Sequence, residues 1–349
     1  MMETKVIQFT KDTSVLDEAA LCLESGGLVA FPTETVYGLG ASALDAEAVS
    51  HIFLAKGRPQ DNPLIVHVSN RAMLEKVVRQ IPPQAEKLME AFWPGPLTII
   101  FEKSDLIPMT VTAGLSTVAV RMPSHPAALA LIEKSGVPVA APSANLSGSP
   151  STTRAEHVIA DLSGRVDYII DGGPCRVGLE STVLDVSGEV PQILRPGGLG
   201  PEDVERVLGS VTFDVALKDQ NAVPKCPGMK YRHYAPKAEL ILVYAGETEK
   251  MRALLAANRQ NGRKTGALSV GAVDYEADFV IDCGTDAASY AQNLFDALRR
   301  MDDLGAEVIV AQLPHDSGGI VPALQNRLMK AAGGHVVADV IPVSEDDTL

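Results

Sequence analysis

Clusters of polar residues interrupt the apolar runs of residues 1–200, and four of the side chains in them are cations. Lys56 and Arg58 lie on a proline-bounded loop, Arg121 ends an apolar run, and Arg195 precedes a Pro-Gly-Gly turn. Guanidinium groups form planar forks that suit phosphate or carboxylate, and a lysine adds a point charge. Hydroxyl-rich loops accompany them, so the clusters predict a concave site for two anions, a polyphosphate and a carboxylate. The clusters are segments 31–40 (FPTETVYGLG), 56–63 (KGRPQDNP), 117–123 (TVAVRMP), 138–151 (PVAAPSANLSGSPS), 178–183 (GLESTV) and 193–198 (ILRPGG).

Each cluster also has a purely structural interpretation. An unpaired Arg121 would be costly in an apolar strand, so it must meet either an acidic residue of the fold or a ligand carboxylate. Segment 31–40 is also typical of a capped strand–turn–helix junction. The loops at 56–63 and 138–151 are also typical of solvated surface loops. His67, at the end of an apolar run, is typical of a buried core histidine.

The familiar catalytic motifs are absent. The sequence contains no GxxxxGK[ST] phosphate loop, no GxGxxG after a strand, no GxSxG elbow and no HExxH zinc motif. Its seven histidines are scattered without metal-ligand spacing. No Cys/His or Ser/His pair stands out as an activated nucleophile. We therefore expect catalysis by positioning and electrostatics, with no metal ligands from the protein.

In the first 210 residues, many short apolar runs are separated by few segments of helical periodicity. This pattern predicts an α/β domain built on a twisted mixed sheet, neither a pure Rossmann domain nor a barrel. The expected strands are 28–31, 64–68, 97–101, 117–121, 137–141, 168–171 and 182–186, and the expected helices are 14–24, 45–55, 82–92, 126–134 and 201–208.

From residue 239 the pattern becomes a regular alternation, which predicts a smaller Rossmann-like, largely parallel α/β domain. Segment 218–237 carries five Lys or Arg and one Asp, and is either a solvated tether or a basic arm over an anionic ligand. We expect a catalytic domain over 1–212, a basic proline-containing linker over 213–238 and a C-terminal domain over 239–349. The expected C-terminal strands are 240–244, 266–270, 279–282 and 308–312, and the helices are 247–259, 287–304 and 321–332.

Composition excludes several classes of protein. The chain has 349 residues, of which 46% are hydrophobic and 21% charged, values that exclude disorder and coiled coil. A formal net charge of −14 argues against a general nucleic-acid binder. No stretch suits a membrane helix, the first residues lack a signal-peptide pattern, and the four dispersed cysteines contain no CxxC pair. We expect a cytoplasmic protein.

The clusters resemble, in order along residues 1–236, the motifs of the YrdC/Sua-type threonylcarbamoyl-adenylate synthases: FPTETVYGLG, K-x-R followed by PQDNPLIVHV, WPGPLT, VAVRMPSHP, APSANLSGSPS, ESTVLD, LRPGG and PGMKYRHYAP. The alternation over 239–340 is similar to the appended C-terminal domain of that family. The resemblance implies a YrdC-like sheet and a nucleotidyltransferase that joins L-threonine, bicarbonate and ATP into L-threonylcarbamoyl-AMP and pyrophosphate. Partner proteins would then pass the threonylcarbamoyl group to a tRNA adenosine beside the anticodon, so this chain need not bind tRNA directly.

The resemblance also implies roles for residues at matching motif positions. The threonine carboxylate is expected to bind Arg121, and the rest of the amino-acid pocket is expected to be Thr35, His67, the backbone of Ala141, and Ser181. ATP is expected to bind Lys56, Arg58, Asn62, Thr117, Ser143, Asn145, Ser151 and Arg195, of which Lys56, Arg58 and Arg195 would be catalytic. Tyr231 is expected to fold back onto the nucleotide, so that the linker becomes a lid that excludes water. Mg²⁺ is expected as the cofactor, bound through the ATP phosphates.

Two other activities fit part of the pattern. A basic groove could bind double-stranded RNA or tRNA, but the acidic net charge and 5% aromatic content, without a stacking stripe, argue against it. A carbamoyl-adenylate enzyme would use carbamoyl phosphate instead of threonine and bicarbonate. Related hydrogenase maturation proteins carry zinc-finger and acylphosphatase-like segments, for which this chain has neither CxxC pairs nor length. Product formation that depends on L-threonine, and not on carbamoyl phosphate, would distinguish a threonylcarbamoyl-adenylate synthase from these alternatives.

Overall fold

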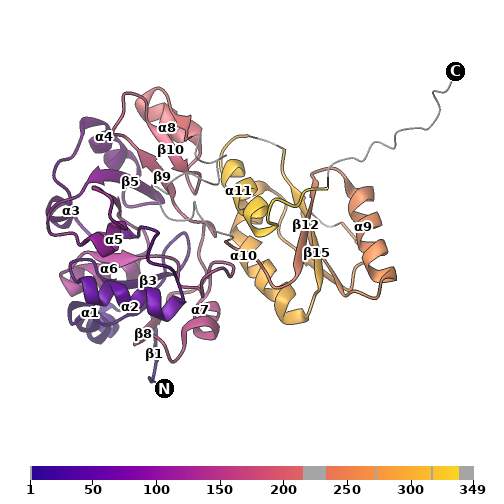
Figure 1. Ribbon diagram of the computed structural model, residues 1–349, viewed down its shortest axis with the longest axis horizontal. Coiled ribbons are helices and arrows are strands. Elements are labelled where there is room, and N and C mark those ends of the chain that lie inside the picture. Colours follow the sequence, from indigo (N-terminus) through magenta and orange to yellow (C-terminus); the bar gives the residue numbers. More distant parts are fainter. Residues whose placement is uncertain (1, 215–232, 272, 316, 338–349) are drawn as a thin grey trace.

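Two β-sheets with helices packed against them organise the described part of the chain, one with eleven strands and one with four (Figure 1). The computed structural model describes residues 2–214, 233–271, 273–315 and 317–337. The larger sheet uses strands up to residue 213, and the smaller sheet begins at residue 239. No helix in these ranges is both long and apolar enough to cross a membrane.

The larger sheet is mixed, which confirms the predicted fold class. Its strands are β1 (Lys5–Gln8), β2 (Val29–Phe31), β3 (Gly38–Ser42), β4 (Ile65–His67), β5 (Leu97–Glu102), β6 (Thr117–Arg121), β7 (Val139–Ala141), β8 (Tyr168–Asp171), β9 (Thr182–Asp185), β10 (Gln192–Arg195) and β11 (Thr212–Phe213). Their order in the sheet is β1-β8-β2-β3-β7-β4-β6-β5-β9-β10-β11. β6 runs parallel to β4 but antiparallel to β5. The N-terminal ends of some strands therefore lie beside the C-terminal ends of others.

Helices cover this sheet, and one of them presents the cationic loop. α2 begins after Asp45, whose carboxylate accepts hydrogen bonds from two backbone amides of the first turn, and it ends at Gly57 with φ 62°. Lys56 is thus the last helical residue, and Arg58 follows the turn. The helices are η1 (Thr13–Leu16), α1 (Asp17–Glu24), α2 (Ala46–Lys56), α3 (Arg71–Val77), α4 (Pro83–Phe92), α5 (Met109–Thr112), α6 (Pro126–Ser135), α7 (Ala155–Leu162) and α8 (Pro201–Leu208).

The segment 31–40 forms a β-hairpin and not the strand–turn–helix junction that its composition also allowed. β3 pairs antiparallel with β2, with Phe31 opposite Gly38. Thr33, Glu34 and Thr35 are typical helix-capping residues, yet the strand β3 follows them. The glycines of β3 explain this, because they leave room for the neighbouring strands. A Cβ on Gly40 would lie 2.6 Å from Val139 Cγ1 and 2.8 Å from Phe31 Cε1, so only a glycine lets the neighbouring strands approach.

Side chains alternate along β6 between the main core and the opposite face of the sheet. Val118 and Val120 belong to the main hydrophobic core, whereas Ala119 belongs to a smaller cluster with Ile65. Because the period of a strand is two residues, Arg121 lies on the face of Ala119. This alternation places a guanidinium at the end of a buried strand without putting it in the core.

A β-bulge decides the direction of Arg195. Ile193 pairs with Leu184 and Arg195 with Val183, which leaves Leu194 as an extra residue in β10. In a regular strand, Leu194 and Arg195 would point to opposite faces. The bulge lets Leu194 join the small cluster around Ile65 while Arg195 lines the pocket on that same side.

The smaller sheet is parallel throughout and confirms the predicted Rossmann-like domain. Its strands are β12 (Glu239–Tyr244), β13 (Thr265–Ser269), β14 (Phe279–Asp282) and β15 (Val308–Leu313), in the order β12-β15-β13-β14. Its helices are α9 (Thr248–Gln260), α10 (Ala287–Leu304) and α11 (Val321–Ala331). α9 covers one face, while α10 and α11 cover the face that turns toward the larger sheet (Figure 1).

One apolar cluster contains residues from both parts of the chain. Val36 and Leu179 join the hydrophobic cluster formed by α10 and α11. Gly178 has φ +79°, and a Cβ there would lie 2.4 Å from the Cα of Gln292 in α10. Both its conformation and this close approach require glycine, so helix α10 sits directly against the ESTVLD segment.

Candidate active site

A pocket lies beside the ends of β2, β4, β6, β7 and β10, and the empty space within it is about 600 Å³ when the open solvent at its mouth is included. The structure brings eight of the predicted site residues into its lining: Thr35, Arg58, His67, Arg121, Ala141, Ser143, Ser181 and Arg195. Lys56, Asn62, Thr117, Asn145 and Ser151 lie outside the lining, and Tyr231 lies outside the described residues. Three guanidinium groups and several hydroxyls therefore share one cavity.

Arg121 is held in a fixed orientation by residues of the fold. Its Nη2 lies 2.6 Å from Glu34 Oε1, its Nη1 donates to Thr35 Oγ1 at 2.8 Å, and its Nε donates to the carbonyl of Gly95 at 3.2 Å. Burial alone would raise the pKa of Glu34, but the charge of Arg121 holds that pKa below its usual value. The sequence left two possible partners for Arg121, an acidic residue of the fold or a ligand carboxylate. Glu34 is such an acidic residue. The threonine-binding role of Arg121 stays a prediction.

Arg58 is the least satisfied cation of the pocket. Among the described residues its buried Nε has no hydrogen-bond partner, and its Nη2 reaches only the carbonyl of Asn62, at 3.5 Å. Burial lowers the pKa of Arg58 to about 10, so the group stays charged at neutral pH. A buried guanidinium with an unused donor is the feature expected of a site that receives an anion.

Arg195 is anchored through Ser181. Its Nη2 donates to the Ser181 carbonyl at 2.9 Å and to the Ser181 hydroxyl at 3.1 Å. The same hydroxyl exchanges a 2.7 Å hydrogen bond with Thr98. A predicted threonine-binding residue and a predicted ATP-binding residue are thus hydrogen-bonded to each other. Their roles toward the two substrates stay predictions.

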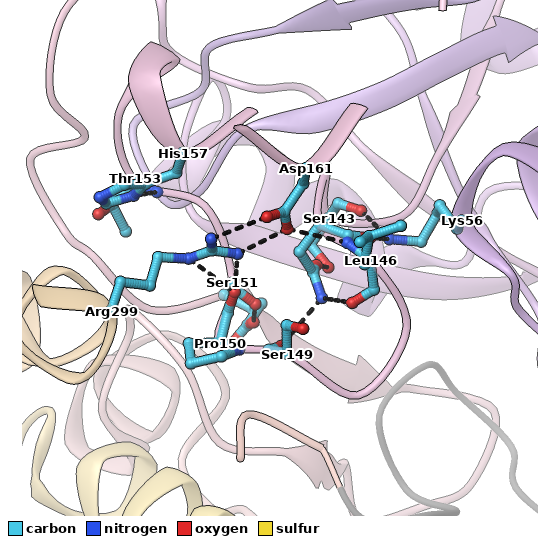
Figure 2. Close-up of polar contacts among 12 residues, drawn as sticks. Lys56, Ser143, Leu146, Ser149, Pro150, Ser151, Thr153, His157, Asp161 and Arg299 are labelled. Atoms are coloured by element: carbon cyan, nitrogen blue, oxygen red, sulfur yellow. Dashed lines mark hydrogen bonds and ion pairs between the residues drawn. The ribbon is translucent and has the colours of Figure 1, made fainter. Parts of the chain in front are cut away.

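Lys56 supports the serine-rich loop and does not line the pocket. Its Nζ donates to the backbone carbonyls of Ser143 and Asn145 (Figure 2). Asn145 in turn donates from Nδ2 to the carbonyls of Leu146 and Ser149, at 2.7 and 3.0 Å. Burial, followed by the nearby charge of Arg58, lowers the pKa of Lys56 well below its usual value. The hydrogen bonds of Lys56 and Asn145 thus shape the loop, and their contact with ATP stays a prediction.

A residue of the C-terminal domain holds the serine-rich loop from the side opposite Lys56. Arg299 of α10 donates to both carboxylate oxygens of Asp161, at 3.0 and 2.8 Å, and to the carbonyl of Pro150. Asp161 Oδ2 also accepts from the backbone amide of Leu146, at 3.0 Å. Figure 2 shows Lys56 and Arg299 reaching the loop from opposite sides. The sequence offered no signal for this contact, because 138 residues separate Arg299 from Asp161.

The remaining predicted ATP ligands lie at different distances from the cavity. Thr117 starts β6, at the opposite end from Arg121, and pairs with Glu102. Ser151 donates to Glu180 Oε1 at 2.6 Å, directly behind the pocket wall. Asn62 is buried on the loop that carries Arg58. Their roles toward ATP stay predictions.

Glu180, His233 and Tyr234 are among the lining residues to which the sequence assigned no role. His233 and Tyr234 belong to the RHYAP end of the linker, a motif in which the family resemblance implies a role for Tyr231 instead. Burial, then the charge of Arg58, lowers the pKa of His233 to about 4. Tyr234 has φ 68°, unusual for a tyrosine, and its ring stacks on Phe295 of α10. The residue pair thus lines the pocket at the point where the linker reaches the C-terminal domain.

His67 is a neutral member of the pocket. Its ring packs edge-on against Phe31, with the ring centroids 5.9 Å apart. Burial, then the charge of Arg121, lowers the pKa of His67 to about 3. The ring is therefore neutral at neutral pH, with one nitrogen protonated and the other free to accept a hydrogen bond. Its role toward threonine stays a prediction.

We expect acidification to destabilise the protein through His67. Its pKa of about 3 in the folded state lies below the 6.5 of an ordinary histidine. The stabilisation by the neutral ring is therefore complete above pH 6.5 and is lost as the pH falls below that value. Between pH 7 and pH 5 the free energy of unfolding should drop by about 2 kcal/mol from this group. Urea unfolding at both pH values measures the drop, and His67→Asn should reduce it; an unchanged drop would contradict the assignment.

In the part of the chain that the structure describes, no three His, Cys, Asp or Glu side chains gather as a metal site. Glu180, a carboxylate of the pocket lining, already binds Arg327 and Ser151. The binding of Mg²⁺ through the ATP phosphates stays a prediction.

Comparisons with known proteins agree over nearly the whole chain. Residues 22–197 match the Sua5/YciO/YrdC family model, described as "Telomere recombination", and residues 200–333 match the model "Threonylcarbamoyl-AMP synthase, C-terminal domain". The chain is 50% identical over 333 residues to the threonylcarbamoyl-AMP synthase of Bacillus subtilis (strain 168), an alignment that covers 94% of this chain and 95% of that protein. It is 49% identical over 324 residues to the threonylcarbamoyl-AMP synthase of Pyrococcus abyssi (strain GE5 / Orsay), with 91% and 94% covered.

The fold comparison gives the same answer. The crystal structure of P. abyssi Sua5 complexed with L-threonine superimposes with a TM-score of 0.91 at 47% identity, covering 96% of this chain and 98% of that one. Both the motif-bearing sheet and the smaller parallel sheet are included in that coverage. The chain therefore belongs to the threonylcarbamoyl-AMP synthase family, a family of nucleotidyltransferase-type enzymes, in its two-domain form.

Proposed function

We propose that this chain condenses L-threonine, bicarbonate and ATP into L-threonylcarbamoyl-AMP and pyrophosphate, and thereby supplies the threonylcarbamoyl group for a tRNA adenosine beside the anticodon. The observation that carries the proposal is the convergence of Arg58, Arg121 and Arg195 on one pocket. Three guanidinium groups suit a substrate set that contains one carboxylate and one triphosphate. The full-length match to named synthases supports the same reaction.

Threonine is proposed to bind with its carboxylate on Arg121. Because Glu34, Thr35 and Gly95 already orient the guanidinium, little side-chain entropy is lost when the substrate arrives. The amine of threonine then captures carbon dioxide derived from bicarbonate, giving a carbamate. His67 lines this part of the pocket without adding a charge that would attract the carbamate elsewhere.

ATP is proposed to bind with its phosphates near Arg58 and Arg195. A carbamate oxygen attacks the α-phosphorus, a new P–O bond forms, and the bond to the β-phosphate breaks so that pyrophosphate leaves with the electron pair. Arg58 and Arg195 compensate the charge that develops on the phosphate oxygens, and the loop held by Lys56 places Ser143 beside them. Mg²⁺, carried by the ATP phosphates, supplies additional charge shielding when it is bound.

The end of the linker is proposed to close the pocket over the adenylate. His233 and Tyr234 line the cavity, and the backbone amide of Ala235 donates to the carbonyl of Gly148 at 3.0 Å. A wall over the site protects the mixed anhydride of the product from water. Proteins that transfer the threonylcarbamoyl group to tRNA are the expected partners downstream.

The proposal predicts a strict dependence on all substrates. With ATP, Mg²⁺, bicarbonate and L-threonine, the protein should release pyrophosphate and form an adenylate with the mass of threonylcarbamoyl-AMP. Omitting threonine or bicarbonate should abolish that product, and carbamoyl phosphate should not replace them. ATP turnover that is indifferent to threonine would overturn the proposal. Mass spectrometry together with a pyrophosphate assay measures both quantities.

A further inference from the structure

Helix α11 of the C-terminal domain buries a charged side chain against the catalytic domain. The side chain of Arg327 is 0% exposed. Its Nε donates to Glu180 Oε2 at 2.8 Å, and its Nη1 donates to the carbonyl of Pro196 at 2.9 Å. Both partners lie in the other domain, 147 and 131 residues away in sequence.

The apolar core of α11 does not need this arginine. Leu324, Leu328 and Ala331 form a helical stripe of fully buried apolar residues, and Arg327 falls within the same stripe. A leucine at this position would continue the stripe, whereas a buried guanidinium carries a desolvation cost unless its partners are well placed. The contacts that Arg327 makes across the domain boundary are therefore the reason to look for a role beyond packing.

Those contacts end next to two pocket residues that are hydrogen-bonded to each other. Glu180 lines the pocket and precedes Ser181, while Pro196 follows Arg195. The backbone amide of Gly198 also donates to the carbonyl of Glu180, at 3.2 Å. Arg327 thus holds the segments 180–181 and 195–198 together, and each of its two partners is the chain neighbour of a residue in the Arg195–Ser181 hydrogen bonds.

The same guanidinium also reaches the end of the linker. Its Cζ lies 5.6 Å from the centroid of the Tyr234 ring, which lines the pocket. A cation near an aromatic ring is attracted to it, and the same ring also stacks on Phe295 of α10. Tyr234 is consequently held between two helices of the C-terminal domain while it forms part of the wall of the catalytic pocket.

We propose that Arg327 is a positioning residue through which the C-terminal domain sets the geometry of the catalytic pocket, by holding the Glu180 carboxylate, the Arg195–Ser181 pair and Tyr234 in one arrangement. The proposal rests on the proposed synthase function, since it concerns the same pocket. Arg327 does not line the pocket, so the C-terminal domain would influence the reaction through the catalytic-domain residues that Arg327 holds.

The test compares variants that remove the contact in two ways. Arg327→Gln leaves the Glu180 carboxylate buried without its partner and can fail to fold, so the paired variant Arg327→Gln/Glu180→Gln removes both charges. Arg327→Lys keeps the charge but loses the second hydrogen bond. Arg154→Gln is the matched control, because Arg154 forms another ion pair across the domain boundary, with Asp296 at 3.0 Å, and does not line the pocket.

We expect the paired variant to melt near the wild-type temperature and yet to lose about 100-fold in kcat, because a displacement of about 1 Å at a reacting group has that effect. Arg327→Lys should recover part of the rate, and Arg154→Gln should keep the wild-type rate. A folded paired variant with wild-type kcat and KM for both substrates would overturn the proposal.

Hydrogen exchange separates this proposal from the proposed function, because it needs no turnover. In the paired variant, the amides of residues 179–183, 195, 197 and 198 should exchange about tenfold faster than in the wild type, while strand β6 stays protected. If the wild type forms no threonylcarbamoyl-AMP, the proposed synthase function is refuted. The exchange result still tests whether Arg327 positions the two segments. Unchanged exchange in both segments would rule out the positioning role whatever the activity.

Discussion

Arg121→Ala is expected to raise the KM for threonine by about 100-fold, the effect of losing a charge-assisted bidentate contact of roughly 3 kcal/mol. The KM for ATP should change little, because the phosphate-binding cations Arg58 and Arg195 remain in place. Steady-state kinetics with each substrate varied in turn measures both constants. Equal losses for threonine and ATP would refute the clamp, since they would mean that the pocket as a whole had collapsed.

The structure shows why this experiment needs a second variant. Arg121 neutralises the buried Glu34, and removing one partner of a buried pair costs about 3–5 kcal/mol in stability. The variant Glu34→Gln/Arg121→Gln removes both charges and should unfold at a higher urea concentration than Arg121→Ala, with the same defect toward threonine. Arg79→Ala serves as the control for a lost arginine, because Arg79 pairs with Asp105 at an exposed site.

Arg58→Met is expected to lower kcat/KM for ATP by about 100- to 1000-fold, the range found when one preorganised donor to a developing charge is removed. The physical reason is that the buried Nε of Arg58 has no hydrogen-bond partner among the residues that the structure describes, so the guanidinium is available to phosphate oxygens. Arg58→Lys should be intermediate, because it retains a charge without the planar fork. Arg79→Met is again the control.

The same variant should not weaken the fold. Burial lowers the pKa of Arg58 to about 10, which means that the folded protein accommodates its charge at a cost. Replacing it with the apolar Met should leave the melting temperature unchanged or raise it, a separation of stability from activity that is typical of functional residues. A large drop in melting temperature together with normal ATP kinetics would show that Arg58 is structural.

Much of the fold could be predicted because it follows from local pattern. The bounds of strand β6 and helix α10 agree with their predicted ranges, and both rest on clear periodicity of two or 3.6 residues. β3 was not predicted, because Gly38 and Gly40 have low strand propensity and are selected by the close approach of Phe31 and Val139. The short edge strands β1 and β11 carry mostly exposed side chains and so left little apolar pattern to detect.

The chemistry of the site was also readable from local sequence. Arginines and hydroxyl residues at strand ends predicted an anion pocket, and eight of the residues that the family resemblance then implied line one cavity. The role of Lys56 could not be read in the same way. Its Nζ points to backbone carbonyls of a loop about ninety residues away, and only the folded chain brings those carbonyls to it.

The sequence by itself determined which side chains could bind anions and which segments would become strands, because both depend on residue type and on spacing over a few positions. The tertiary structure alone decided the partners: Glu34 for Arg121, the bulge that turns Arg195 toward the pocket, and Arg327 behind Glu180. A buried charge is stable only beside a partner of opposite charge or a hydrogen-bonding group. That partner can lie more than a hundred residues away, so only the packing of the two domains identifies it.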